Sequence, residues 1–115
     1  MEDLTKYLKY MMEKDASDIY LTVGVPPMYR IEGVVYPYGS DVMGPEDTEA
    51  IAYLAMNDRQ RKIFEESLEM NLALYYPELG RFRVNIFRQR GYMGLVIRQI
   101  KIQIRSIDEL MLPQT

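Results

Sequence analysis

Residues 80–98 decide the fold of this chain, and they read Gly-Arg-Phe-Arg-Val-Asn-Ile-Phe-Arg-Gln-Arg-Gly-Tyr-Met-Gly-Leu-Val-Ile-Arg. Apolar and polar side chains alternate on both sides of Arg90-Gly91, which is the pattern of two half-buried strands joined by a short turn. One face of the first strand carries Phe82, Val84 and Ile86, and the other carries Arg81, Arg83, Asn85 and Phe87. The stretch therefore predicts a β-hairpin with one apolar and one basic face.

A two-residue loop at residues 90–91 fixes the register of this hairpin, because it places Gln89 opposite Tyr92. Carried along both strands, the same register places Arg83 opposite Arg98 on one face. A four-residue loop centred on the same bond keeps this register, whereas a three-residue loop breaks it. Facing guanidinium groups repel each other. We therefore expect an anion between them, or a carboxylate from elsewhere in the chain such as Glu78 or Glu69.

Basic residues are concentrated around the hairpin. Residues 79–107 contain seven basic residues and no acidic one, so this segment carries a charge of +7. The 17 acidic residues and the other seven basic residues give the rest of the chain a charge of −10, and the two parts sum to −3. A basic hairpin of this kind attracts anions, but basic side chains also protect an edge hairpin from aggregation. Charge alone leaves both interpretations open.

The composition excludes several classes of function. The chain has no cysteine and no histidine, which excludes disulfides, thiolate metal sites, Ser-His-Asp and Cys-His catalysis and most zinc sites. Neither Gly-x-x-x-x-Gly-Lys-Ser/Thr nor Gly-x-Gly-x-x-Gly occurs. No apolar run approaches the ~20 residues of a membrane span. We therefore expect no catalytic residue, no metal site and no cofactor that belongs to this chain alone.

The rest of the chain alternates between helical and strand periodicity. Apolar spacing predicts helices at residues 3–13 and 45–56 and strands at residues 18–23, 28–31, 34–36 and 70–76. A capping box between Asn57 and Gln60 begins another helix, and a second capping box at Ser106 begins a last helical turn. The side chains expected to face the core from the second and third helices are Ile51, Leu54, Ala55, Ile63 and Phe64. Asp3 is placed to cap the first helix or to interact favourably with the positive end of its dipole.

Short connections between consecutive strands favour antiparallel pairing. At 115 residues the chain has the length of one domain. We therefore expect an α+β domain with an antiparallel sheet and with helices packed on one face.

Residues 16–33 read Ala-Ser-Asp-Ile-Tyr-Leu-Thr-Val-Gly-Val-Pro-Pro-Met-Tyr-Arg-Ile-Glu-Gly, and residues 106–113 read Ser-Ile-Asp-Glu-Leu-Met-Leu-Pro. Together with residues 80–91, these stretches resemble the N-terminal domain of the twitching-motility ATPases, the PilT and PilU family of the secretion ATPase superfamily. The three motifs lie in the order typical of that family and span nearly the whole chain. Two positions depart from the family pattern: Tyr20 replaces a frequent histidine and Met111 replaces a usual glycine.

The resemblance implies that residues 1–113 form the PAS-like N-terminal domain of a type IV pilus retraction ATPase. The RecA-like C-terminal ATPase domain would be absent from this chain, and ATP and Mg would belong to the parent protein. The implied partners are the ATPase domains of the same and neighbouring subunits in a homo-hexamer, and the inner-membrane platform protein of the pilus machine, with no nucleic acid. The implied location is the cytoplasm, peripheral to the inner membrane.

The resemblance also implies a nucleotide-binding role for the hairpin. In the wider family, arginines on this hairpin reach the nucleotide phosphates that the C-terminal domain holds, and the matching positions here are Arg83 and Arg98. These are the two arginines that strand register places face to face. Arg81, on the same strand face as Arg83, is the third nucleotide-binding candidate.

Two functions from other classes stay open at this point. One is a PAS-like small-ligand sensor or protein-interaction module, and the sensor needs a closed apolar cavity inside the sheet. The other is an RNA-binding sheet that uses Phe87, Tyr92 and the arginines. An RNA binder is distinguished by a steep dependence of its affinity on salt concentration.

Overall fold

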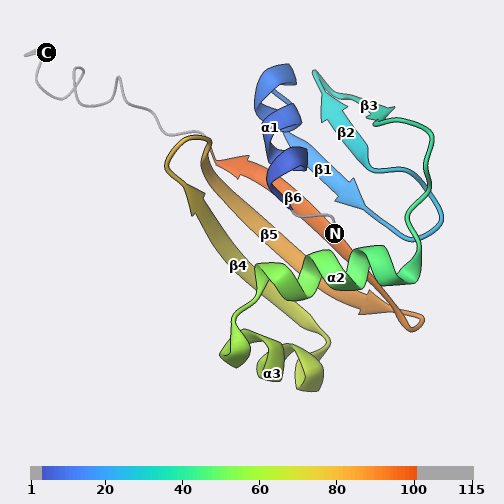
Figure 1. Ribbon diagram of the computed structural model, residues 1–115, viewed down its shortest axis with the longest axis vertical. Coiled ribbons are helices and arrows are strands. Elements are labelled where there is room, and N and C mark those ends of the chain that lie inside the picture. The colour runs from blue at the N-terminus through green and yellow to red at the C-terminus, as the bar shows by residue number, and fades with distance from the viewer. Residues whose placement is uncertain (1–3, 101–115) are drawn as a thin grey trace, which may run out of the picture.

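The computed structural model describes residues 4–100, which form one six-stranded antiparallel sheet and three helices (Figure 1). The helices are α1 (Leu4–Lys14), α2 (Pro45–Ala55) and α3 (Asp58–Ser67). The strands are β1 (Asp18–Leu21), β2 (Met28–Ile31), β3 (Val34–Pro37), β4 (Glu69–Tyr76), β5 (Gly80–Gln89) and β6 (Tyr92–Ile100). The expected α+β class with an antiparallel sheet is confirmed. Asp3 and the helical turn expected after Ser106 lie outside the described residues.

The strands pair in the order β3-β2-β1-β6-β5-β4, so the first and second halves of the chain meet where β1 pairs with β6. Hairpin β5–β6 has the predicted two-residue loop, in which Arg90 has a φ of 55° and Gly91 a φ of 84°. Positive φ at both loop residues matches the twist of the flanking strands. The register that this loop sets is confirmed, because Gln89 lies opposite Tyr92 and Arg83 lies opposite Arg98.

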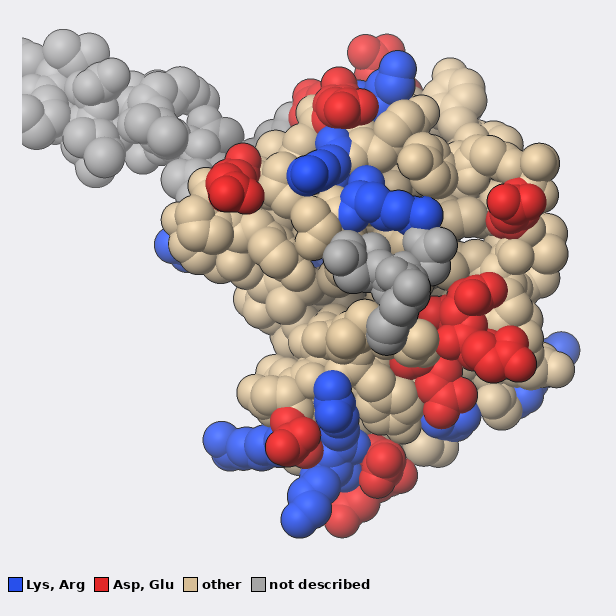
Figure 2. Space-filling view, in the orientation of Figure 1, with Lys and Arg blue, Asp and Glu red and all other residues tan. Residues whose placement is uncertain are grey.

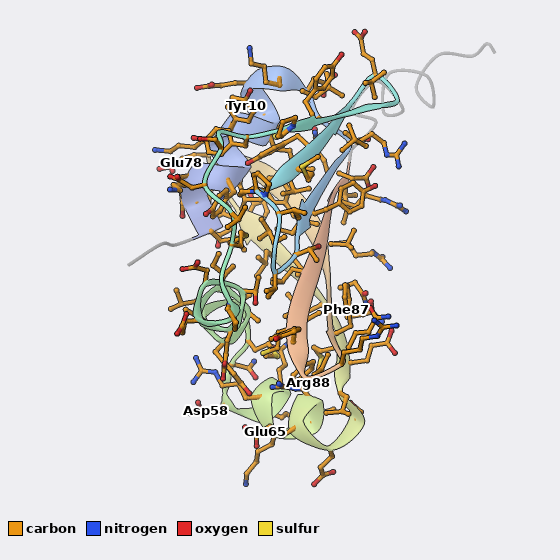
Figure 3. The ribbon with its side chains drawn as sticks, turned by 90° about the vertical axis from the view of Figure 1, so that its right-hand side faces the viewer. Tyr10, Asp58, Glu65, Glu78, Phe87 and Arg88 are labelled. Carbon is orange, nitrogen blue, oxygen red and sulfur yellow. The ribbon has the colours of Figure 1, made fainter. Side chains whose placement is uncertain are left out.

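The core lies on one face of the sheet, under helices α1 and α2. Alternation brings Phe82, Val84 and Ile86 of β5 to this face, and all three are fully buried. Leu8 of α1 and Ile51 of α2 pack into the same cluster. Figure 3 views the molecule from its side and shows these helices against one face of the sheet while side chains of the opposite face point into solvent. The sheet therefore has one covered face and one uncovered face.

Helices α2 and α3 begin as the sequence predicts but bury fewer apolar residues than expected. Asn57 Oδ1 accepts a hydrogen bond from the backbone N–H of Gln60, and Gln60 Oε1 accepts one from the N–H of Asn57, which confirms the capping box at α3. Leu54 is 49% exposed and Ile63 is 45% exposed, so these two expected core positions are wrong. Each helix turns only a narrow stripe of side chains toward the core, and Leu54 and Ile63 lie outside the stripes of their helices. In α2 the fully buried positions are Thr48, Ile51 and Ala52.

On the helix-covered side of the molecule, acidic side chains gather near the N-terminus of α2 (Figure 2). Figure 2 shows acidic side chains gathered near the start of α2, where Glu46 and Asp47 occupy the first turn, and it shows both signs mixed over α3. Carboxylates at a helix N-terminus are stabilised by the helix dipole. This acidic group is therefore explained by helix stability and needs no acid–base chemistry.

On the uncovered face, an aromatic ring lies over a glycine. Phe87 of β5 lies opposite Gly94 of β6. A Cβ atom added to Gly94 would approach Cε1 of the Phe87 ring to 2.7 Å. Glycine at this position lets the ring lie against the strand backbone, a cross-strand packing that offsets the weakness of glycine in a strand.

We predict that Gly94→Ala lowers the free energy of unfolding by about 1 kcal/mol. The new methyl group forces the Phe87 ring aside, and overpacking of about 1–3 kcal/mol outweighs the roughly 0.5–1 kcal/mol that alanine gains over glycine in a strand. In a Phe87→Ala background the obstacle is gone, so the same change should be neutral or stabilising. Urea denaturation of the four proteins measures the effect, and an equal loss in both backgrounds would contradict this explanation.

Candidate functional site

A row of cross-strand neighbours crosses the uncovered face of the sheet. Pairing on both sides of β1 and β6 aligns one residue from every strand in a single line. In the order of the strands from β3 to β4, the row consists of Val35, Arg30, Asp18, Arg98, Arg83 and Ala73. Three guanidinium groups and one carboxylate thus occupy the centre of this face, and their net charge is positive.

The two facing arginines border a shallow groove of about 280 Å³. The groove is lined by Asn71, Arg83, Asn85, Val96 and Arg98. The side chain of Asn85 donates a hydrogen bond to Oδ1 of Asn71 at 2.7 Å, which fixes one wall. Both arginines are exposed. The groove therefore offers cationic hydrogen-bond donors to a ligand that approaches the bare face of the sheet.

Asp18 is the carboxylate that accompanies the arginines. It is only 5% exposed, and its Oδ1 atom accepts a hydrogen bond from Nε of Arg98 at 3.0 Å. Its Oδ2 atom accepts a hydrogen bond from the hydroxyl of Ser17 at 2.8 Å and lies 3.5 Å from Nε of Arg30. The expectation of a carboxylate from elsewhere in the chain is confirmed, but the residue is Asp18 and neither Glu78 nor Glu69.

Arg30 lies next to Asp18 on the neighbouring strand β2, on the side away from Arg98. Its Nε atom donates a hydrogen bond to the hydroxyl of Tyr20 at 3.2 Å, and this contact raises the pKa of Arg30, with a smaller contribution from the charge of Asp18. Tyr20 stands where the resembled family often has a histidine, and here its hydroxyl serves as a hydrogen-bond acceptor on the uncovered face. Arg30 therefore stays charged.

The two facing arginines differ in their contacts. Within residues 4–100, Arg98 bonds Asp18 through Nε alone, and its terminal nitrogens make no hydrogen bond. Arg83 makes no hydrogen bond or ion pair with any described residue. Of the pair, only Arg98 is therefore held by another residue within the part of the chain that the structure describes, and both keep donors that no described residue uses.

Arg81, the third sequence candidate, lies apart from the groove. It is on the same strand face as Arg83, but its register partner is Ile100. Its guanidinium group lies over the ring of Tyr75, with 5.2 Å from Cζ to the ring centroid. The structure thus brings together two of the three arginines and leaves Arg81 against an aromatic ring outside the row.

Two further observations bear on the site. Among residues 4–100, no group of three or more histidine, cysteine, aspartate or glutamate side chains is arranged to hold a metal ion. Within the same residues, no helix is both long and apolar enough to cross a membrane. Within residues 4–100, the charged side chains at the centre of the uncovered face are thus three arginines and one aspartate.

Comparison with solved structures finds the same fold in part of two other proteins. The structure matches the ATPase DotB of Legionella pneumophila with a TM-score of 0.71 over 96% of this chain and 34% of that one; at 16% identity this shows the fold alone. It matches the crystal structure of the pilus retraction motor PilT with bound ADP with a TM-score of 0.80 and 33% identity, over 90% of this chain and 31% of that one. No protein-family model matches the chain.

Sequence comparison leads to the pilus motors in particular. The chain is 39% identical to the type IV pilus ATPase PilU of Pseudomonas aeruginosa over 97% of its length, and 38% identical to the retraction ATPase PilT of the same organism over 94%. It spans 29% and 31% of those two proteins. The chain is homologous to the N-terminal region of the PilT and PilU type IV pilus ATPases.

We predict that the two facing arginines differ in their effect on stability. Arg98→Ala should lower the free energy of unfolding by about 1 kcal/mol, because it leaves one oxygen of the buried Asp18 carboxylate without its donor. An unsatisfied buried group costs about 1–3 kcal/mol, and the low end applies here because 70% of the Arg98 side chain is exposed.

Arg83→Ala is the matched control, and it should change the free energy of unfolding by less than about 0.5 kcal/mol, since it removes only a repulsive charge. Urea denaturation of both variants measures the difference. Equal losses in the two would show that the Asp18–Arg98 contact adds nothing to stability.

Proposed function

We propose that this chain is the N-terminal coupling domain of a hexameric type IV pilus retraction ATPase. Residues 1–113 would form the PAS-like domain, and the RecA-like ATPase domain would follow in a longer protein. The proposal is supported by the homology to PilT and PilU and by the fact that the chain spans only about 30% of those relatives. ATP and Mg would then be bound by the parent protein, as the ADP in the solved PilT motor suggests for the nucleotide.

The arginine pair is the observation that carries a specific role for this domain. Arg83 and Arg98 face each other across one groove, and Arg98 presents its terminal nitrogens while Arg83 has no described partner. The planar fork of arginine binds phosphate oxygens in a bidentate manner and stays charged at every physiological pH. We assign to the pair the closure of the active site on the terminal phosphates of ATP, with Arg81 as a more distant contributor.

This role requires an assembly in which the uncovered sheet face meets a nucleotide. The domain would pack on the ATPase domain of its own and of a neighbouring subunit, and closure around ATP would couple hydrolysis to movement between subunits. The parent would act as a homo-hexamer in the cytoplasm, next to the platform protein of the pilus at the inner membrane. The side of the sheet opposite α1 and α2 is available for such a contact (Figure 3).

The RNA-binding alternative receives less support from the geometry. Of its two aromatic side chains, Phe87 lies against Gly94, while Tyr92 is 52% exposed at the hairpin tip. Stacking on bases needs free aromatic faces, and one of the two candidates is already engaged. For the small-ligand sensor, no specific observation on the described face points to a ligand other than an anion.

We predict that Arg83→Ala and Arg98→Ala each reduce ATP turnover of the longer hexameric protein by roughly one to two decades. A hydrogen bond to a charged group contributes about 1.5–3 kcal/mol, and each ~1.4 kcal/mol is tenfold in rate if closure limits turnover. Steady-state phosphate release with melting temperature measured in parallel provides the test.

Arg90→Ala is the matched control for this experiment. Arg90 lies on the same hairpin but in its loop, away from the groove. Its removal changes the net charge by the same amount and should leave turnover within about twofold, since surface charges at this distance are screened. Wild-type turnover in both groove variants, or equal losses in all three, would contradict the assigned role.

We also predict that the 115-residue chain hydrolyses no ATP by itself. The sequence contains no phosphate loop, cysteine or histidine, and the groove is lined by arginine, asparagine and valine side chains. Phosphate release by the purified chain should equal that of a buffer blank, measured over several chromatographic steps. Activity that follows the chain through every step would contradict this expectation.

A further inference from the structure

Asp18 has more hydrogen-bond and ion-pair contacts than a solubilising surface charge needs. The carboxylate is buried, and both oxygens are used: Oδ1 by Arg98, and Oδ2 by Ser17 with Arg30 nearby. Its place is fixed by backbone pairing, because β1 lies between β2 and β6 and Asp18 pairs with Arg30 on one side and with Arg98 on the other. A carboxylate held this firmly can in turn fix the side chain that it bonds.

We infer that Asp18 is a positioning residue, which holds Arg98 so that its two terminal nitrogens face a phosphate oxyanion shared with Arg83. The inference rests on the proposed phosphate-binding role of the arginine pair. It adds a residue to that site, and it gives a reason why, among the described residues, Arg98 has a partner and Arg83 has none.

The geometry of the contact supports this role. Asp18 accepts from Nε at 3.0 Å, the nitrogen farthest from the end of the guanidinium group, so the outer edge of the fork stays available. A bidentate contact that included the outer nitrogens would use up the donors that a phosphate needs. Arg83, directly opposite, would otherwise repel Arg98 and turn it away from the groove. The single contact to Asp18 opposes that repulsion without occupying the groove.

The charge of Asp18 and its positioning effect act on anion binding in opposite directions. Removing a carboxylate strengthens the attraction of the site for any anion, whereas releasing Arg98 weakens the bound geometry. Asp18→Asn and Asp18→Ala remove the same charge, but only asparagine keeps an oxygen that can accept from Nε of Arg98. A comparison of these two variants therefore isolates positioning from charge.

The experiment is a titration of the 115-residue chain with inorganic tripolyphosphate at low ionic strength. NMR signals of the Nε–H groups of Arg83 and Arg98 report binding, and we expect both to shift with one common dissociation constant. The Asp18→Asn variant should bind roughly three- to tenfold more tightly than Asp18→Ala, the range expected for ordering one rotamer-rich side chain. Hydrogen exchange at Nε of Arg98 should be slow in the wild type and in Asp18→Asn, and fast in Asp18→Ala.

Arg98→Lys gives a second route should Asp18→Ala destabilise the sheet. Lysine keeps the charge but cannot bond Asp18 through one nitrogen and present a planar fork with two others, so it should lose affinity for tripolyphosphate by a similar factor. Equal affinities in Asp18→Asn and Asp18→Ala, wild-type affinity in Arg98→Lys, or no shift of the Arg98 signal in the wild type would each overturn the inference.

The tripolyphosphate experiment tests the positioning role of Asp18 independently of the proposed function. If the groove variants of the longer protein hydrolyse ATP at the wild-type rate, the proposed role in the motor fails. Tripolyphosphate binding that depends on the Asp18 side chain would in that case still show that Asp18 positions Arg98 for an anion. If turnover falls in the groove variants while Asp18→Asn and Asp18→Ala bind alike, the arginine role stands and the positioning role of Asp18 fails.

Discussion

The contact between the Asp18 carboxylate and Nε of Arg98 joins the two halves of this molecule on its uncovered face. The two residues are 80 positions apart in the chain and meet only because β1 pairs with β6. The turn at Arg90-Gly91 sets the register on the other side of β6, so that Arg83 follows Arg98 in the same row. The position of every charged group in the groove depends on these two pairings.

The row carries more positive than negative charge. The row holds one carboxylate and three guanidinium groups, and a buried carboxylate left without donors would cost about 1–3 kcal/mol or more. Asp18 is satisfied by Ser17, Arg98 and the nearby Arg30, whereas Arg83 has no described partner. Like charges on facing strand positions are destabilising. The fold therefore retains a small unfavourable interaction that an anion in the groove would relieve.

The local features of this structure could be predicted from the sequence, and the non-local ones could not. The hairpin register follows from a two-residue loop, and the start of α3 follows from Asn57 and Gln60, because both depend on residues that are neighbours in the chain. The pairing of β1 with β6 depends on the whole sheet order, so the sequence predicts a carboxylate beside the arginines but does not identify it as Asp18. A useful signal was present, since Asp18 is the charged residue at the start of an otherwise apolar strand.

The exposed positions of Leu54 and Ile63 have a similar origin. Helical periodicity predicts which residues share a face, but the width of the buried stripe depends on how closely the helix approaches the sheet. Helix α2 buries Thr48, Ile51 and Ala52, and α3 buries Phe64. Both helices therefore leave apolar side chains in solvent that a sequence pattern assigns to the core.

The most direct test of this account is a crystal structure of the longer, ATPase-containing protein with a non-hydrolysable ATP analogue and magnesium. The account predicts that Arg83 and Arg98 both lie within hydrogen-bond distance, about 2.7–3.2 Å, of oxygens of the terminal phosphates in a closed subunit. It also predicts that Nε of Arg98 still donates to Asp18. A closed active site whose phosphates are bound by other residues, with the groove of β5 and β6 open to solvent, would contradict it.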